Sequence, residues 1–357
     1  MSVKRTWLFC VAALISACGT DDNRPLSMNA LYDNPDISGF AIADRVLRFE
    51  FPRDHGEHLD FQTEWWYLVG VVTDEHQREF GFQFTLFRQA LTPETPFENE
   101  WRTGQIYMAH FAISDIALRD HNAFERFSRG HEHLAGVSIS PFQAFLEDWV
   151  LASADDMSSS LELRTQDSGY ALDLTLDVTK APVLHGDDGL SWKSPTNASY
   201  YYSIPRLKTS GTLTTPERTF EVSGNAWLDR EWSTGILNPN YLGWNWLTVH
   251  LDDGRDLVLF NLEPKSNDVE VMPVGMLVEQ DGSRTRLSPD EWRMHPVRFW
   301  RSWPVGWELE LDDSIFTIEP AFDDQLMTTS VRYWEGVVYV LHDKQRIGTG
   351  YLELTGY

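Results

Sequence analysis

Hydrophobic and polar residues alternate along most of this chain, which is the pattern of strands that turn one face toward a core. Across residues 170–178 apolar side chains occupy every second position, and phenylalanines do the same across residues 80–84. Polar turns such as Asp253-Gly254 separate these runs and favour hairpins. Helical periodicity is scarce, and residues 141–151 are the best candidate for a short helix. The pattern predicts an all-β protein of antiparallel hairpins.

Two parts of this pattern occur twice. The aromatic segment 65–68 and its hairpin resemble segment 244–247 and its hairpin, and segment 224–229 resembles segment 348–353. Each half therefore has an aromatic opening hairpin and, later, a closing strand that carries an acid. Because both matches occur in the same order, we expect two homologous domains. Closure of each sheet into a barrel would remove its exposed edges.

The N-terminal residues have the features of an export signal. Lys4 and Arg5 precede an apolar stretch that is too short to span a bilayer. The stretch ends in Ile-Ser-Ala-Cys at residues 15–18, which fits a bacterial lipobox whose cysteine, Cys18, is lipidated and becomes the mature N-terminus. The next residue is Gly19 rather than Asp, which favours sorting to the outer membrane, facing the periplasm.

The chain therefore divides into four expected parts. Residues 1–17 form a lipoprotein signal peptide, and the polar residues 18–40 form a tether. Residues 41–235 and 236–357 form the two β-barrel domains. We expect a cell-envelope protein that reaches the membrane through its N-terminal lipid anchor.

Composition narrows the classes of partner. The chain carries 29 Lys+Arg against 54 Asp+Glu, a net charge of −25 at pH 7, which argues against nucleic acid as a partner. Cleavage before Cys18 leaves a single cysteine, so that no intramolecular disulfide can form. The 15 tryptophans indicate either a large aromatic core or a pocket for a hydrophobic small molecule.

Five motifs between residue 55 and the C-terminus form a specific combination. They are His55-Gly56-Glu57-His58 with Thr63-Glu64-Trp65-Trp66-Tyr67, then Tyr107–Phe111, Tyr200–Arg206, Ala226–Trp232 and Gly350–Tyr357. The combination resembles the lipocalin-like carotenoid 1,2-hydratase (hydroxyneurosporene synthase) and AttH family. The resemblance implies two tandem lipocalin-like antiparallel β-barrels. Its members include pigment hydratases, transporter-associated AttH proteins and distant fungal cyclases that fold polyene substrates.

Two acids in the fourth motif are candidates for proton chemistry. On a strand, Trp227, Asp229 and Glu231 project from one face, with the carboxylates roughly 7 Å apart at Cα. In an apolar lumen, repulsion and desolvation would raise at least one pKa, as a carboxylic acid needs in order to protonate an alkene at neutral pH. The hydratase resemblance points to Asp229 as the acid. Aromatic faces such as those of Trp227 and Tyr202 would stabilise the resulting carbocation.

Further aromatic residues are candidates for lining the ligand site of such an enzyme, which would need no cofactor. They are Trp65, Trp66, Tyr67, Trp244 and Trp246.

A structural interpretation of the same acids stays open. Asp229 and Glu231 could pair with Arg206 or Arg88 and close a barrel end, and Glu64 could pair with a barrel arginine.

The histidines suggest neither a metal site nor a base. The pairs at positions 55 and 58 and at 131 and 133 have ligand-like spacing, but spacing indicates no third ligand, so no metal is expected. His110 and His250 lie in apolar segments and are expected to be core histidines.

Two functions follow. The first is a cofactor-free hydratase-type lyase or isomerase that acts on an apolar polyene or lipid-like substrate. The second is a non-catalytic lipocalin-like carrier, or an accessory lipoprotein of an ABC-type envelope transporter.

Overall fold

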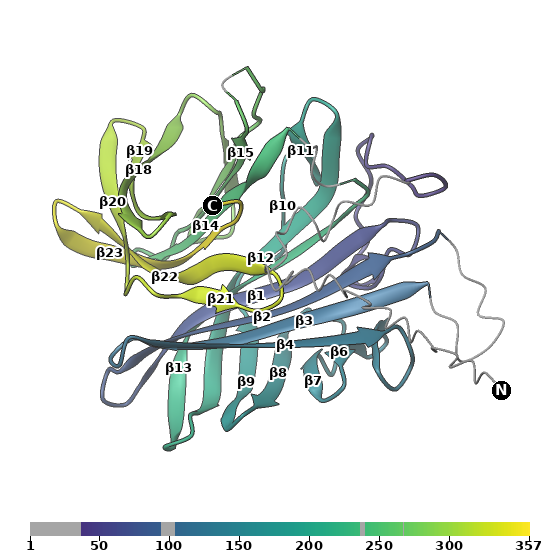
Figure 1. Cartoon of the computed structure of the whole chain (residues 1–357), viewed down its shortest axis with the longest axis horizontal. Coiled ribbons are helices and arrows are strands. Elements are labelled where there is room, and N and C mark those ends of the chain that lie inside the picture. The colour runs from purple at the N-terminus through teal and green to yellow at the C-terminus, as the bar shows by residue number, and fades with distance from the viewer. Residues whose placement is uncertain (1–36, 94–103, 236–239, 267) are drawn as a thin grey trace, which may run out of the picture.

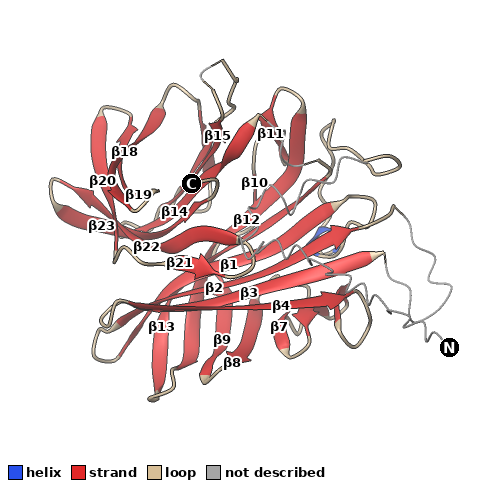
Figure 2. Ribbon diagram, viewed as in Figure 1, coloured by secondary structure: helices blue, strands red, loops and turns tan. Residues whose placement is uncertain are grey.

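A computed structural model describes residues 37–93, 104–235, 240–266 and 268–357 (Figure 1). The signal peptide, Cys18 and most of the tether therefore lie outside the described residues. Among the residues described, strands dominate, and the only helix is the short 3-10 turn η1 (Arg53–His55) (Figure 2). The prediction of an all-β fold is confirmed. None of the described helices is long and apolar enough to cross a membrane.

The prediction of a helix at residues 141–151 is wrong. Strands β6 (Phe142–Leu146) and β7 (Trp149–Ala152) occupy this segment and pair with each other. Every second side chain of β6 is buried, so a period of two describes this segment better than a helical one.

Within the described ranges, the first sheet has 13 antiparallel strands and curls around one hydrophobic core. Along its main path the order is β4-β3-β2-β1-β13-β12-β9-β8-β7-β6-β5, and β10 and β11 pair with β12. Contacts of β6 with β2, β3 and β4 bring the two ends of the sheet together, so that the barrel is nearly closed. Besides β6 and β7, its strands are β1 (Thr63–Asp74), β2 (Glu79–Ala90), β3 (Gln105–Asp115), β4 (Asp120–Arg129), β5 (Ala135–Ile139), β8 (Ser160–Asp167), β9 (Tyr170–Val178), β10 (Val183–Leu184), β11 (Leu190–Ser194), β12 (Asn197–Thr214) and β13 (Thr219–Ser233).

The second sheet has, in the part of the chain that the structure describes, ten antiparallel strands around a core of its own. Its order is β17-β16-β15-β14-β23-β22-β20-β19-β18, with β21 paired to β22. The strands are β14 (Tyr241–Leu251), β15 (Asp256–Pro264), β16 (Val274–Val278), β17 (Arg284–Leu287), β18 (Trp292–Trp300), β19 (Trp303–Leu311), β20 (Ser314–Pro320), β21 (Leu326–Thr328), β22 (Arg332–His342) and β23 (Gln345–Leu354).

The matching segments of the two sheets occupy equivalent places. β1 pairs with β2 and β13, and β14 pairs with β15 and β23. Tyr67 faces Asp229 across the first pairing, and Trp246 faces Glu353 across the second. The two acids at the ends of the sequence matches therefore sit at the same register position of their sheets.

The two sheets pack against each other through the outer faces of these strands. β1 contacts β23, and a third hydrophobic core contains residues of both sheets. Tyr67 meets Trp246 edge to face, with ring centroids 5.0 Å apart. Strand β1 is consequently buried on both faces, which explains why residues 65–72 contain so few polar side chains.

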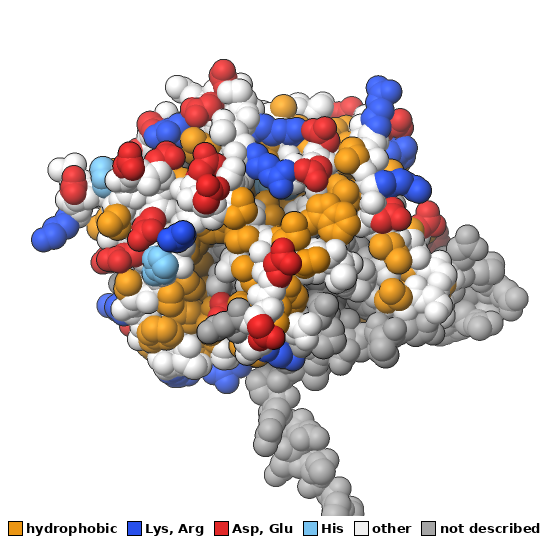
Figure 3. Space-filling view, turned by 90° about the horizontal axis from the view of Figure 1, so that it is seen from above, with side chains coloured by type: hydrophobic (Ala, Val, Ile, Leu, Met, Phe, Trp, Pro, Cys, Tyr) orange, Lys and Arg blue, Asp and Glu red, His pale blue; other side chains and the backbone are white. Residues whose placement is uncertain are grey.

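An ion cluster also joins the sheets. Asp256 of β15 accepts hydrogen bonds from Lys180 at 2.7 Å and from Arg206 of β12 at 2.7 Å, and it lies 2.7 Å from His250 Nδ1. Both cations belong to the first sheet's half of the chain, so the cluster holds the domains together. Figure 3 shows one face of the molecule, on which hydrophobic side chains are mixed with acidic and basic ones.

Candidate functional site

Strands β1 and β13 separate two environments. On one face, Glu64, Trp66 and Arg230 point into the barrel of the first sheet. On the other face, Tyr67 and Asp229, which pair directly, point toward the second sheet. Because side chains alternate along a strand, one step in sequence changes the environment of a residue completely.

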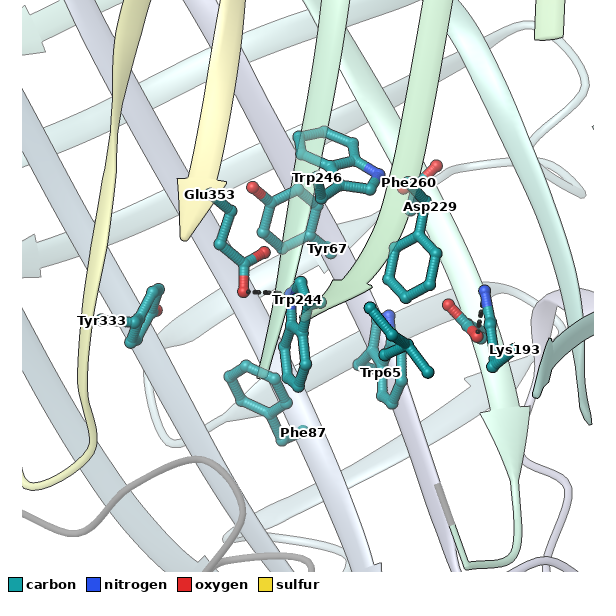
Figure 4. A pocket seen from close by; sticks show the side chains of 12 residues that line it. Trp65, Tyr67, Phe87, Lys193, Asp229, Trp244, Trp246, Phe260, Tyr333 and Glu353 are labelled. Atoms are coloured by element: carbon teal, nitrogen blue, oxygen red, sulfur yellow. Dashed lines mark hydrogen bonds and ion pairs between the residues drawn. The ribbon is translucent and has the colours of Figure 1, made fainter. Parts of the chain in front are cut away.

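A pocket lies between the two sheets (Figure 4). Its walls are mainly aromatic, with three carboxylates and one lysine. The cavity volume is about 50 Å³, room for only a few waters, so a larger ligand enters only when the walls move. The lining residues are Trp65, Tyr67, Phe87, Lys193, Asp229, Glu231, Trp244, Trp246, Phe260, Leu262, Tyr333 and Glu353.

Asp229 is held in this pocket by neutral donors. Its Oδ2 accepts the Tyr201 hydroxyl at 2.6 Å, and its Oδ1 accepts the Trp227 indole at 2.6 Å and the Ser203 hydroxyl. Burial raises the pKa of Asp229 to about 7, and repulsion from Glu231 adds to the rise that the three hydrogen bonds oppose. The carboxyl group is therefore poised to give or take a proton near neutral pH.

Lys193 of β11 is the cation of the pocket wall. Its Nζ lies 3.0 Å from Glu231 Oε1 and 4.2 Å from the centroid of the Phe260 ring. The ion pair lacks hydrogen-bond geometry, and among the described residues this buried ammonium group has no hydrogen-bond partner. Its N–H groups are thus available to an acceptor atom of a ligand.

The lining acid Glu353 has a second buried acid, Glu335, beside it. Glu335 of β22 pairs across strands with Glu353 of β23. Tyr67 donates to Glu335 at 2.5 Å, and Trp244 donates to Glu353 at 3.0 Å. Burial raises the pKa of Glu335 to about 8 and the pKa of Glu353 well above its usual range. Both shifts favour the protonated, uncharged forms of these carboxyls.

Glu64 has the opposite environment. It lies fully buried inside the first barrel, with Arg230 Nη2 at 2.7 Å, Arg88 Nε at 3.1 Å and His58 Nδ1 at 2.6 Å. Although burial alone would raise the pKa of Glu64, Arg230, His58 and Arg88 hold it well below its usual range. Arg230 in turn lies over the ring of Trp66, 3.9 Å from its centroid.

The structure brings some expected site residues together and separates others. The indole N–H of Trp227 donates a hydrogen bond to Asp229. The expected residues that line the pocket are Asp229, Glu231, Trp65, Tyr67, Trp244 and Trp246. Tyr202 does not join them, because it lies on the barrel side, with its hydroxyl 2.5 Å from His55 Nδ1. Trp66 is also on that side, in the first core.

The arginines have other partners than Asp229 and Glu231. Arg88 bonds Glu64, and Arg206 bonds Asp256. The catalytic roles expected for Asp229, Glu231 and Trp227 stay predictions.

The residues that sequence reasoning missed include Tyr201, Lys193, Tyr333 and Glu335. Tyr201 was hidden because residues 200–202 are all tyrosine, so the sequence gives no polar marker of which side chain faces the pocket. Tyr333 and Glu335 come from β22, which only the packing of the two sheets brings to β13, whereas Lys193 comes from β11, which joins the first sheet through β12. Within the described part of the chain, no group of three His, Cys, Asp or Glu residues is arranged to hold a metal ion.

Comparisons with known proteins identify the family and the fold of this chain. A search of curated protein sequences gives no match. Among solved structures, the chain is similar to a Nitrosomonas europaea protein designated an AttH protein, with 32% identity and a TM-score of 0.79 over 89% of this chain and 99% of that one. It is also similar to kievitone hydratase from Nectria haematococca, with 15% identity and a TM-score of 0.63 over 93% and 96% of the two chains.

A third similar structure is CghA with Sch210972, with 13% identity and a TM-score of 0.54 over 82% and 88% of the two chains. At these identities, CghA and kievitone hydratase show the shared fold alone. The AttH-like family model matches residues 43–357. This chain therefore belongs to the AttH-like family, and its two sheets have the lipocalin-like hydratase fold.

Proposed function

We propose that this protein is a cofactor-free hydratase-type lyase or isomerase that acts in the pocket between its two domains. The substrate is an apolar polyene or lipid-like molecule, and Asp229 is the proton donor. The observation that carries the proposal is the buried Asp229 carboxyl, which faces an aromatic pocket, is bonded by neutral donors and has its pKa raised to about 7. The hydratase among its structural neighbours supports this reaction class.

The hydration step balances without a cofactor. Protonated Asp229 gives its proton to one carbon of a substrate double bond, which leaves a carbocation at the other carbon. The faces of Trp65, Trp244 and Trp246 can stabilise that cation. Water then forms the new C–O bond and releases a proton, so that the net change is the addition of one water and the Asp229 proton is restored. If a substrate proton is lost instead, the product is an isomer.

Lys193 would orient the substrate. Its buried N–H groups can bind an oxygen atom of the ligand, while Phe260 and Trp65 pack against the apolar part. The substrate class is then an apolar molecule with at least one acceptor oxygen.

Labelled water provides the test. Apolar extracts are incubated with the full chain in heavy-oxygen water or in deuterium oxide, and the products are analysed by mass spectrometry. A hydratase incorporates heavy oxygen, whereas an isomerase incorporates deuterium alone. Asp229→Asn should abolish incorporation and retain ligand binding, whereas Glu221→Asn, an exposed change on the same strand, should be silent. Incorporation at the wild-type rate by Asp229→Asn would eliminate the assigned acid.

Envelope anchoring forms part of the proposal. The lipobox supports lipidation at Cys18 and attachment to the outer membrane on its periplasmic side. Cys18→Ala should abolish labelling by radioactive palmitate and release the protein to the soluble periplasmic fraction. Unchanged labelling of Cys18→Ala would refute the lipid anchor.

A second cavity favours the alternative function, a carrier or an accessory lipoprotein of an ABC-type transporter. Inside the second sheet, a cup of about 480 Å³ has leucine-rich walls that include Leu251, Leu277 and Leu309. This volume lies within the roughly 300–1,000 Å³ of small-molecule sites. If the cup carries an apolar ligand, Leu277→Arg should abolish Nile red binding, whereas the exposed control Leu242→Arg should not. Equal binding by both variants would exclude the cup as the carrier site.

A further inference from the structure

His110, expected to be a core histidine, lies at the centre of a hydrogen-bond chain between the surface and the pocket. Its Nδ1 lies 2.7 Å from the Tyr333 hydroxyl, and its Nε2 lies 3.0 Å from Glu125 Oε1. The His110 side chain is completely buried, whereas 16% of the Glu125 side chain is exposed. Tyr333 lines the pocket, on the opposite side from Asp229 in Figure 4.

The charges define the direction of these bonds. Burial lowers the pKa of His110, so its ring is neutral at neutral pH. Burial would raise the pKa of Glu125, but its hydrogen bonds to His110 and Ser330 lower it, so Glu125 is a carboxylate. A carboxylate only accepts hydrogen bonds; hence Nε2 carries the imidazole hydrogen, and Nδ1 accepts the hydroxyl hydrogen of Tyr333. Hydroxyl, imidazole and carboxylate thus stand in the order by which enzymes activate a hydroxyl group.

Both domains are needed to assemble this chain. Glu125 and His110 belong to β4 and β3 of the first sheet, and Tyr333 belongs to β22 of the second. Ser330, which precedes β22, donates to Glu125 from its backbone N–H at 3.1 Å and from its hydroxyl at 2.7 Å. The ring of Phe87 packs edge-on against His110 and shields it from solvent.

The chain also continues inward. Glu335 lies two residues after Tyr333 on the same face of β22, and it accepts the Tyr67 hydroxyl at 2.5 Å. Glu335 is itself buried, so a proton that reaches it from solvent must pass through neighbouring groups.

We propose that Glu125, His110 and Tyr333 form a proton relay between solvent and the interdomain pocket, with the Tyr333 hydroxyl as the group that exchanges a proton with a bound molecule. This inference rests on the proposed function, because only a reaction that moves protons uses such a relay. As the Tyr333 oxygen takes a proton from bound water or substrate, its own proton passes to His110 Nδ1, and the Nε2 proton passes to Glu125. The reverse transfer restores each group, so no proton is consumed.

The relay can be tested without a substrate. A caged proton is released by a laser flash to lower the pH from about 9 to about 6, which brackets the pKa of about 8 for Glu335. Time-resolved infrared absorption then follows the carboxyl band of Glu335. The band is assigned to Glu335 because it is missing from the spectrum of Glu335→Gln. His110→Gln should slow the appearance of this band at least ~10-fold, because the amide of glutamine does not pass protons on. The pH at which half of Glu335 is protonated at equilibrium should stay the same. Glu125→Gln should slow the appearance of the band less, because solvent can still reach Nε2 after a local opening.

A matched control separates the relay from a general effect of histidine loss. His121 is partly buried, on β4, and its partner Ser114 lies outside the pocket lining. His121→Gln should therefore keep the wild-type rate. If His110→Gln does not fold, Tyr333→Phe and Glu125→Gln decide instead. Wild-type rates in the folded relay variants would overturn the relay and leave the labelled-water test of Asp229 standing, because the flash experiment needs no turnover.

Discussion

Glu64 and Asp229 are buried acids on neighbouring strands of one sheet, yet their surroundings move their pKa values in opposite directions. Glu64 lies inside the first barrel between Arg88 and Arg230, and its pKa is held low. Asp229 faces the second sheet, where its partners are neutral and its pKa is raised to about 7. Burial is similar for the two acids, so the charge of the partners decides between a structural ion pair and a proton donor.

Removal of the charge of Glu64 should give the largest effect. Glu64→Gln leaves Arg88 and Arg230 buried without their counter-charge, so we expect a loss of about 3–5 kcal/mol in the free energy of unfolding, measured with urea. Glu162→Gln, which breaks the exposed pair with Arg164, should change it by less than about 0.5 kcal/mol. Similar losses for both variants would mean that the buried cluster has no special structural role.

The same ion pairs give Glu64 a definite pH dependence. Its pKa is lower in the folded chain, so its contribution to stability is present above the unfolded pKa and is lost as the pH falls through the folded value. Wild type should therefore lose stability in acid, and Glu64→Gln should lack that part of the loss.

The pH dependence of stability that Asp229 causes should have the opposite sign from that of Glu64. The folded pKa of Asp229 is raised, so the folded state is favoured at low pH and loses stability as the pH rises through about 7. As the pH rises from about 5 to about 8, the free energy of unfolding of Asp229→Asn should increase by about 2 kcal/mol relative to that of wild type. Urea unfolding of both proteins at each pH measures this change. The substitution also weakens hydrogen bonds of residue 229, but this loss is the same at both pH values and therefore cancels when the two are compared. A constant difference between variant and wild type would contradict the raised pKa.

The smallest expected effect concerns the like charge beside Asp229. Glu231→Gln removes the repulsion and leaves the Lys193 ammonium without its counter-charge, so the pKa of Asp229 should fall by about 1 unit. Carbon-13 NMR of the side-chain carboxyl measures this directly. Glu221→Gln on the exposed end of β13 serves as the control and should leave the Asp229 resonance unchanged. A higher pKa in Glu231→Gln would show that the two acids do not repel each other.

Much of the fold could be predicted because alternation and turn residues act locally. The strand Tyr170–Val178 follows from local alternation, and the aromatic and acid-bearing strands of each half follow from segments repeated in order. The pairing of these two strands in each half is seen in the structure. The error at residues 141–151 arose where two short strands follow each other closely, so a short apolar run fits either period.

The site could be predicted only in part. Asp229, Trp65 and Trp244 were identified because an acid among aromatic residues is conspicuous in the sequence. The sequence favours Tyr202, whereas Tyr201 bonds Asp229 in the structure, because a run of three tyrosines does not show which side chain faces which side of the strand. Lys193 and Tyr333 were missed because neither lies near Asp229 in sequence, and both reach the pocket from other strands.

The sequence by itself determined the β architecture, the twofold repetition and the family, because these depend on periodicity and on short motifs. The tertiary structure alone decided which acids meet cations and which meet neutral donors. Arg88 and Arg230 reach Glu64 on the barrel side of β1 and β13, while the second sheet covers the other side and buries Asp229 among tyrosine, serine and tryptophan. The pKa of a buried acid depends on groups within a few ångströms of it in space. Arg88 and Arg230 come from other strands than Glu64, and Tyr201 comes from another strand than Asp229, so local sequence does not show these contacts.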